Sequence, residues 1–405
     1  MNKTLALLMG LCLAAMAHAQ TSIHELYGFT CGPLTTGYFC PEGAEPAALI
    51  QASDGKIYGV AETSYAAHGT SVVPGGGTIF TITPAGQLTV LYTFPRDTKT
   101  GLFDNGGDPS SIAEGSDGLL YGVASDSGLT SASSGTLWRI HKDGTGFQVL
   151  ERYCTSCTTG SFPNYIMAAS DGNLYGTTGN GGSFSASICQ GLGCGVVFRL
   201  TTGGAYTVLH AFNGTTDTSY PLGITQASDG NFYGATGSES GGGLFRVTAS
   251  GSYTNLFTFG LSKYALAPLT QASNGLLYGF SHVTSAATIE FFSLSLSGVV
   301  NNIETITQPL FKQYGIGKLL QATDGNLWTS AAVGGAGYGR VFSITPTGTI
   351  VDSLNFANTV GSFPTGGLIQ TLDGTLYGTT TQLGTAPGGG FSFGVIYTIS
   401  GLPAR

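Results

Sequence analysis

Charged side chains are scarce in this chain of 405 residues, where Asp, Glu, Lys and Arg together make up 9% of the total. Basic residues are the rarer kind, with 14 Lys and Arg against 22 Asp and Glu, so the formal net charge is -8. Proteins that bind nucleic acid or anionic membranes carry basic patches that attract phosphate. The composition therefore argues against both as partners.

Helix-forming stretches are also missing beyond the first twenty residues. Glycine occurs 65 times, and each glycine in a helix costs about 1 kcal/mol relative to alanine. A helical bundle or coiled coil is therefore excluded. Disorder is excluded as well, because 41% hydrophobic and 11% aromatic residues are enough to form a buried core. What remains is a folded chain of strands and turns.

Long apolar runs are absent too, with one exception at the N-terminus. Lys3 precedes an apolar run from Leu5 to Ala17, which ends in the small-x-small sequence Ala17-His18-Ala19. This order is typical of a secretory signal peptide, and the run is shorter than the ~20 residues of a transmembrane helix. We predict that residues 1–19 are a signal peptide. The mature chain is then a soluble secreted or periplasmic protein with no membrane span.

The chain has 7 cysteines, of which only Cys12 lies in the signal segment. The others are even in number and reach an oxidising compartment, so disulfide bonds are expected. Several connectivities are possible, but three short spacings favour local pairs. A zinc site on the same thiolates is the rival, which export disfavours. The predicted pairs are Cys31 with Cys40, Cys154 with Cys157, and Cys189 with Cys194.

One unit is repeated seven times, with copies that begin near residues 46, 109, 163, 221, 267, 317 and 364. The copy at 221 reads PLGITQASDGNFYGAT and continues to GGLFRVTASG and then YTNLFTF. The Asp-Gly turn between two apolar runs indicates a type I′ β-hairpin. A second tight turn follows, so each unit predicts four antiparallel strands.

A single four-stranded meander cannot bury both of its faces, whereas seven can if they pack face to face in a ring. We predict an all-β fold, a seven-bladed β-propeller that spans residues 20–405 as one domain. An open stack of the same sheets is the alternative. The termini favour the ring, because the last repeat lacks a fourth strand and residues 23–29 supply a spare one. The N-terminal strand is therefore predicted to complete the last blade.

The connections indicate where a site would lie. Turns between strands one and two, and between strands three and four, share one face of the ring and are short. The other face carries long irregular loops and all the mature cysteines, and loops on a rigid scaffold are common binding sites. Aromatic residues in these loops predict a stacking surface for sugars or apolar peptide segments. The predicted ligand-binding residues are Tyr65, Phe103, Phe184, Tyr220, Tyr314, Tyr338 and Phe391.

Residues at repeated positions are interpreted as structural, because a group needed once for catalysis has no reason to occur in every repeat. This interpretation covers the turn acid Asp54, the strand-two aromatic Tyr58 and their equivalents in the other copies. No catalytic residue, metal or cofactor is predicted, since the chain has no H-E-x-x-H, phosphate-loop or EF-hand motif. A calcium site is an alternative on one loop, where Asp97, Asp104 and Asp108 could supply oxygen ligands.

The repeat resembles a known family. The combination Leu-Ile-Gln-x-x-Asp-Gly-x-Leu-Tyr-Gly-Thr-Thr, then Gly-x-Val-Phe-x-Ile-Thr, then Thr-Val-Leu-x-x-Phe, is similar to the Gloeo/Verruco (GloVer) tandem repeat of exported bacterial proteins. The resemblance covers essentially the whole mature chain. It implies an exported, propeller-like repeat protein, and it brings no established activity. Two copies depart from the pattern, with Asn274 for the turn Asp and Trp328-Thr329 for Tyr-Gly.

Two functions are consistent with these features. The first is an exported, non-catalytic binding or scaffold propeller whose loop face contacts a polysaccharide or a surface protein. The alternative is a glycoside hydrolase or polysaccharide lyase with its site at the loop-side mouth of the ring. Hydrolysis would need two carboxylates near the channel, and the candidates are Asp104, Asp108 and Asp217.

Overall fold

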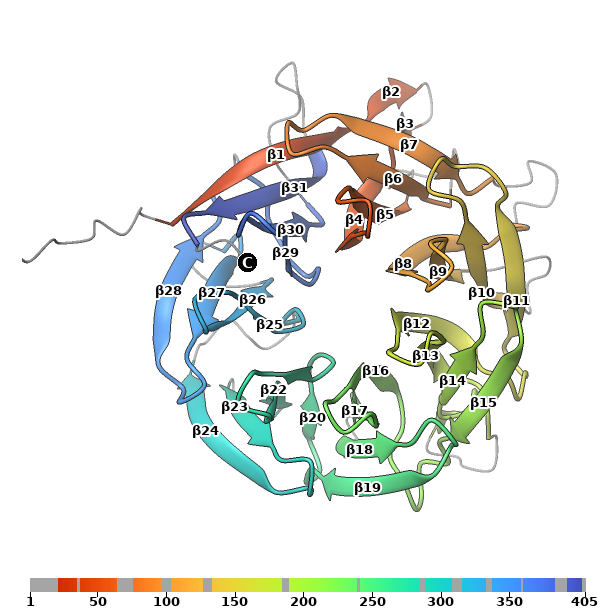
Figure 1. Cartoon of the computed structure of the whole chain (residues 1–405), viewed down its shortest axis with the longest axis vertical. Coiled ribbons are helices and arrows are strands. Elements are labelled where there is room, and N and C mark those ends of the chain that lie inside the picture. The colour runs from red at the N-terminus through yellow and green to blue at the C-terminus, as the bar shows by residue number, and fades with distance from the viewer. Residues whose placement is uncertain are drawn as a thin grey trace, which may run out of the picture.

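A computed structural model of the chain describes residues 21–34, 37–63, 76–95, 103–126, 133–183, 189–238, 241–284, 288–307, 315–332, 337–357, 360–382 and 392–402. The predicted signal peptide lies outside these residues. Within them, no segment forms a helix long and apolar enough to cross a membrane. The elements are β-strands, and they form seven antiparallel sheets around a central axis (Figure 1). The predicted seven-bladed β-propeller is confirmed.

The strands follow the chain from blade to blade. Blade 1 consists of β4 (Ala44–Gln51), β5 (Ile57–Thr63), β6 (Thr78–Ile82) and β7 (Leu88–Thr93). Blade 2 consists of β8 (Gly107–Glu114), β9 (Leu120–Asp126), β10 (Ser133–Ile140) and β11 (Gln148–Cys154). Blade 3 consists of β12 (Ser161–Ala168), β13 (Leu174–Asn180), β14 (Val196–Leu200) and β15 (Tyr206–Ala211). Blade 4 consists of β16 (Pro221–Gln226), β17 (Phe232–Thr236), β18 (Gly243–Val247) and β19 (Tyr253–Thr258).

The first strand is interrupted in blade 5, where β20 (Lys263–Ala265) and β21 (Thr270–Gln271) both pair with β22. The rest of this blade is β22 (Leu277–Val283), β23 (Thr288–Leu294) and β24 (Val300–Thr307). Blade 6 consists of β25 (Leu320–Gln321), β26 (Leu327–Ala331), β27 (Arg340–Ile344) and β28 (Ile350–Asn355). Blade 7 combines β29 (Ile369–Gln370), β30 (Leu376–Thr380) and β31 (Ser392–Ser400) with β1 (Ser22–Thr30).

The ring is closed by its first strand. β1 pairs antiparallel with β31, from Ser22 opposite Ser400 to Thr30 opposite Ser392, and Figure 1 shows the red N-terminal strand beside the blue C-terminal one. Phe29 on β1 is fully buried in a core shared by blades 1 and 7. The predicted closure is confirmed.

The tight turn between strands one and two has a different geometry from the predicted one. A type I′ turn needs a positive φ at both central residues, but in each turn only the glycine has one, such as Gly55 at 80°. Gly55 N donates to Ala52 O at 2.8 Å, and Ala52 N donates to Lys56 O at 2.9 Å. These bonds define a type I turn followed by a glycine bulge. The prediction of a type I′ turn was therefore wrong.

The turn acids accept hydrogen bonds in this geometry. The carboxylate of Asp54 accepts the backbone N–H of Lys56 at 3.1 Å and the hydroxyl of Tyr58 at 2.9 Å. Asp117, Asp171 and Asp229 accept the equivalent tyrosine hydroxyl, and Asp324 accepts the indole N–H of Trp328. The structural interpretation of these acids is confirmed, but the reason is hydrogen bonding and not tolerance of left-handed backbone.

In blades 4 to 7, a glutamine that precedes the tight turn joins the blade to the preceding one. Gln271, for example, accepts the backbone N–H of Ser228 in the preceding blade at 2.8 Å and donates to Gly275 O in its own turn at 2.9 Å. The side chains of Gln226, Gln321 and Gln370 accept the equivalent backbone N–H from the turn of the preceding blade. In blade 2 the acceptor is Glu114. This side chain therefore links adjacent blades at five junctions of the ring.

A glycine on strand two lies opposite an aromatic residue on strand three in six blades. Gly122 pairs with Trp138, and a β-carbon at Gly122 would lie 2.1 Å from Trp138 Cζ2. The other pairs are Gly59 with Phe80, Gly176 with Phe198, Gly234 with Phe245, Gly279 with Phe292, and Gly378 with Tyr397. The aromatic ring therefore occupies the space that a side chain would take.

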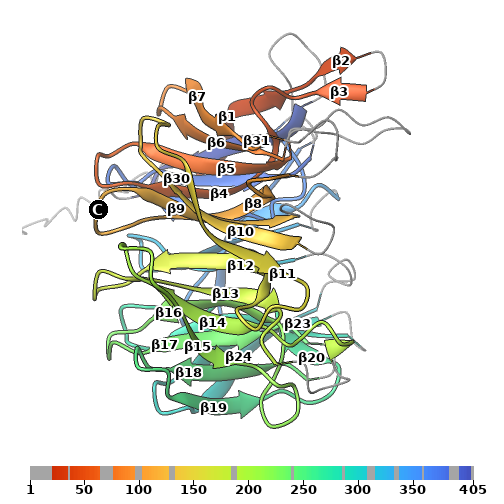
Figure 2. The same cartoon turned by 90° about the vertical axis from the view of Figure 1, so that its right-hand side faces the viewer.

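Three disulfide bonds join the predicted partners, Cys31 with Cys40, Cys154 with Cys157, and Cys189 with Cys194. The first ties the end of β1 to the hairpin of β2 (Gly32–Leu34) and β3 (Gly37–Phe39), which projects from the ring in the edge-on view of Figure 2. The third is fully buried in the core between blades 3 and 4. All three lie on the loop face, as predicted.

Candidate functional site

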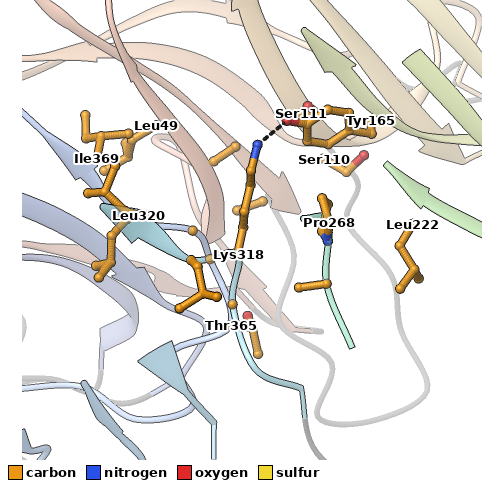
Figure 3. Close-up of a pocket in the computed structure, with 18 of the residues that line it drawn as sticks. Leu49, Ser110, Ser111, Tyr165, Leu222, Pro268, Lys318, Leu320, Thr365 and Ile369 are labelled. Carbon is orange, nitrogen blue, oxygen red and sulfur yellow. Dashed lines mark hydrogen bonds between the residues drawn. The ribbon is translucent and has the colours of Figure 1, made fainter. Parts of the chain in front are cut away.

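A cavity of about 830 Å³ occupies the axis of the ring, where the first strands of the blades converge. Leu49, Ile369 and Leu320 contribute apolar wall (Figure 3). Polar groups lie at both ends of the cavity: Gln226 and Gln271 beside the tight turns, and others toward the loop face, where strand one begins and strand two ends. Those toward the loop face include Glu62 and Asn164. A concave apolar wall with a few convergent polar groups is typical of a ligand site.

One ring of positions around this axis breaks the repeat symmetry. These residues directly precede the buried Leu or Ile of strand one. Five of them are Ala, Ser, Gly or Pro and have short side chains. The two from blades 3 and 6 have long side chains that end in a polar group. In blade order they are Ala48, Ser111, Tyr165, Gly223, Pro268, Lys318 and Gly367.

Tyr165 and Lys318 meet across the channel. Lys318 Nζ donates a hydrogen bond of 2.9 Å to Tyr165 Oη, and Figure 3 shows the lysine extended across the cavity. Gly223 makes room for the tyrosine, because a β-carbon at Gly223 would lie 2.9 Å from Tyr165 Cγ. Both polar side chains are half-buried. Together they form a polar bridge inside a wall of small residues.

Asn164 and Glu62 lie nearer the loop-side mouth. The Asn164 amide is held in place, since it donates to Pro221 O at 2.8 Å and accepts from Thr177 Oγ1 at 2.7 Å. Burial, with the nearby charges of Asp108 and Glu45, raises the pKa of Glu62 to about 7. Burial also raises the pKa of Asp108 to about 7, with further contributions from the charges of Asp126 and Glu45. A group of acids that exchange protons near neutral pH therefore lies between blades 1 and 2.

Replacing Glu62 by glutamine is expected to stabilise the protein at pH 8 and to have little effect at pH 5. The pKa of Glu62 is about 7 in the folded state and 4.5 in the reference state, so the folded chain keeps this proton to higher pH. The free energy of unfolding of the wild type then falls as pH rises through this window, and Glu62→Gln removes that loss. We expect a gain of about 1–3 kcal/mol at pH 8.

Urea unfolding at both pH values measures this effect. Glu304→Gln is the matched control, because Glu304 is exposed on the outer strand β24. Equal shifts for Glu62→Gln at pH 5 and pH 8 would contradict the assignment.

The predicted loop aromatics are only partly described. Tyr65, Phe184, Tyr314 and Phe391 lie outside the described residues. Phe103 packs against the backbone of Gly76 and Gly107 between blades 1 and 2. Tyr220 begins blade 4, where its N–H donates to Cys194 O at 3.0 Å, and Tyr338 packs against the core of blades 6 and 7. These three aromatics are half-buried at three different blade boundaries, and none of them lines the axial cavity.

The loop acids also have separate environments. Asp217 is buried and accepts His210 Nε2 at 2.8 Å and the N–H of Asn213 at 2.7 Å, so it holds its own loop. Asp104 is exposed, and its carbonyl accepts the guanidinium of Arg152. Asp97 lies outside the described residues. The described part of the chain contains no group of three His, Cys, Asp or Glu residues that could hold a metal ion.

Sequence reasoning missed Tyr165, Lys318 and Glu62 as site residues. The first two were visible as departures from the repeat, since every other copy has a small residue or proline at that position. Their contact was not visible, because it joins residues 153 positions apart. Glu62 gave no signal beyond its place at the end of a strand.

The fold and the axial cavity define a seven-bladed β-propeller with an open centre. Residues 45–289 match the Gloeobacter/Verrucomicrobia repeat, and the chain belongs to this family. A search of curated proteins found no match.

Several solved propellers share the fold. The periplasmic gluconolactonase of Pseudomonas aeruginosa is 15% identical, with a TM-score of 0.53 over 82% of this chain and 96% of that one. A Bacteroides fragilis protein provisionally assigned as a 6-phosphogluconolactonase is 18% identical, with a TM-score of 0.52 over 81% and 89%. An extracellular domain from B. thetaiotaomicron, provisionally assigned to a hybrid two-component system, is 11% identical, with a TM-score of 0.55 over 93% and 42%. At these identities the likeness shows the fold alone.

Proposed function

We propose that the protein is an exported, non-catalytic binding propeller that takes a saccharide into the loop-side end of its central channel. The single observation that carries this proposal is the pair of Tyr165 and Lys318, which places unique polar chemistry in a ring of otherwise short residues. Three disulfide bonds support an oxidising, extracytoplasmic location.

The wall of the cavity matches the chemistry of a sugar. A sugar ring has apolar C–H faces and a rim of hydroxyls, so it needs aromatic or aliphatic surface beside hydrogen-bonding groups. Tyr165 offers a ring face, Leu49 and Ile369 offer aliphatic surface, and Asn164 offers a fixed amide. The cavity volume of about 830 Å³ lies within the usual range of ligand sites.

The loop aromatics extend this site in the proposal. A glycan longer than the cavity would project from the loop-side mouth and pass over that face of the ring. Aromatic side chains bind such chains by stacking. The proposed outer contacts are Tyr65, Phe103, Phe184, Tyr220, Tyr314, Tyr338 and Phe391.

Replacing Tyr165 by alanine is expected to weaken glycan binding by about tenfold, which corresponds to about 1.4 kcal/mol. A glycan array identifies ligands of the wild type, and isothermal titration measures affinity for both proteins. Phe257→Ala is the matched control, because Phe257 is 37% exposed on the outer strand β19 and away from the axial cavity. Undiminished binding by a folded Tyr165→Ala variant would contradict the proposed site.

A second candidate is a hydrolase or lyase at the same mouth. The observation that favours it is the pKa of about 7 for both Glu62 and Asp108, because acids tuned to neutral pH are common in active sites. Glu62 is, however, the sole carboxylate among the described residues that line the cavity. Incubation with polysaccharide and analysis of reducing ends and unsaturated products decides between the two. Turnover that Glu62→Gln abolishes would favour the enzyme.

A further inference from the structure

Lys318 is the sole basic residue among the described residues that line the axial cavity. It forms no ion pair with any described residue, whereas Lys142 and Lys263 each pair with a glutamate. A half-buried ammonium group without a carboxylate is costly, because burial removes part of its hydration. No described carboxylate is therefore paired with this ammonium group, although Glu62 lines the same cavity.

Hydrogen bonds hold the backbone next to Lys318 in place. Gly317 N donates to Ser330 O at 2.9 Å, and Thr329 Oγ1 donates to Gly317 O at 2.7 Å, so the start of strand one is anchored to strand two of the same blade. The side of Lys318 that faces blade 7 is open. A β-carbon added at Gly367 would have only Lys318 Cβ as a neighbour, at 3.8 Å.

Two donors converge at the centre of the cavity. An ammonium group has three N–H bonds, and Lys318 gives one of them to Tyr165 Oη. The tyrosine hydroxyl accepts that bond, so its own O–H remains available to donate. An acceptor group placed beside the pair can therefore receive one hydrogen bond from each residue, and both bonds are stronger if the acceptor is charged.

We propose that the saccharide bound in the channel carries a carboxylate, as uronic acids do, and that Lys318 and Tyr165 hold this group. The inference rests on the proposed function and specifies its ligand class. One lysine matches the single charge of a carboxylate, whereas a phosphate carries more negative charge at neutral pH. Lys318 provides the charge, and Tyr165 provides the second hydrogen bond and fixes the lysine.

Paired ligands test the proposal. Oligosaccharides of galacturonic acid, of mannuronic acid and of hyaluronan are each titrated beside the same oligosaccharide after carboxyl reduction, which removes the charge and keeps the rest of the sugar. The proteins are the wild type, Lys318→Met and Lys318→Arg. Methionine keeps much of the side-chain length without the charge, and arginine keeps the charge. Thermal unfolding confirms that each variant is folded.

We expect the wild type to bind at least one acidic oligosaccharide about tenfold more tightly than its reduced form. Lys318→Met should lose that preference, with a larger loss of affinity for the acidic form than for the neutral form, while Lys318→Arg should keep part of it. A preference that survives in Lys318→Met would overturn the role of Lys318. Competition by inorganic phosphate as strong as that by the uronic acid would overturn the carboxylate assignment.

Different results would refute the carboxylate assignment and the saccharide-binding function. Equal binding of acidic and neutral oligosaccharides by the wild type refutes the carboxylate and leaves the saccharide-binding function standing. Absence of binding to these ligands and to the whole glycan array refutes the saccharide-binding function itself.

Discussion

Replacing Phe29 by alanine is expected to lower the free energy of unfolding by about 3–5 kcal/mol, the usual cost of truncating a buried phenylalanine. Phe29 is fully buried, and its ring contacts Phe80 of blade 1 at 5.6 Å between centroids. Its strand pairs with β31 through the backbone, and Phe29 shares a core with Ile396 of that strand. The truncation therefore weakens the one junction at which no peptide bond joins the third and fourth strands of a blade.

Phe94 provides the matched control, because it is fully buried at the equivalent place after β7 in blade 1. Both alanine variants should lose comparable equilibrium stability in guanidinium unfolding. Only Phe29→Ala should also release the N-terminal strand, which limited proteolysis within residues 21–34 would detect. An unfolding free energy within 1 kcal/mol of the wild type, or equal proteolysis of both variants, would contradict this account of ring closure.

Replacing Gly122 by valine is expected to cost about 3 kcal/mol or more, because overpacking a dense core typically costs 1–3 kcal/mol and here also meets the main chain. A β-carbon at this position would lie 2.1 Å from Trp138 Cζ2 and 2.7 Å from Ser111 O. The indole can shift only against neighbouring core residues, and the carbonyl belongs to an adjacent strand. Guanidinium unfolding measures the loss.

The chain contains two controls for this substitution. Gly260→Ala should be nearly neutral, because a β-carbon there would have no neighbour within 4 Å. Blade 6 places Thr329 opposite Phe342 at the equivalent position, so in this blade a threonine is accommodated opposite a phenylalanine. The double variant Gly122→Thr with Trp138→Phe should therefore be more stable than Gly122→Thr alone. A Gly122→Val variant as stable as the wild type would show that the indole contact is not restrictive.

Repetition made the architecture predictable. Seven copies of one pattern indicated seven blades, and the unpaired pattern at residues 23–29 indicated closure by β1. The turn type was not predictable in the same way, because Asp-Gly is compatible with more than one hairpin turn. The hydrogen bonds of Asp54 with Lys56 and Tyr58 accompany the type I form, and they depend on side-chain placement that the dipeptide alone does not specify.

The candidate site was less predictable for a different reason. Repeated positions were interpreted as structural, and this was correct for Asp54 and for the buried Tyr58. The same reasoning turned attention to the loops and away from strand one, where Tyr165 and Lys318 are the exceptional members of a repeated position. Their chemistry depends on contact across the axis, and only the closed ring brings blades 3 and 6 together there.

The pairing of β1 with β31 has a consequence for biosynthesis. The first strand leaves the ribosome long before its partner exists, since Ser22 pairs with Ser400. Until β31 is synthesised, blade 7 is incomplete and β1 has no strand to pair with. The unpaired backbone of β1 is then available for mispairing. Final assembly must therefore wait for nearly the whole polypeptide, so a nascent chain stalled before β31 would retain an accessible N-terminal segment whatever the state of the blades between.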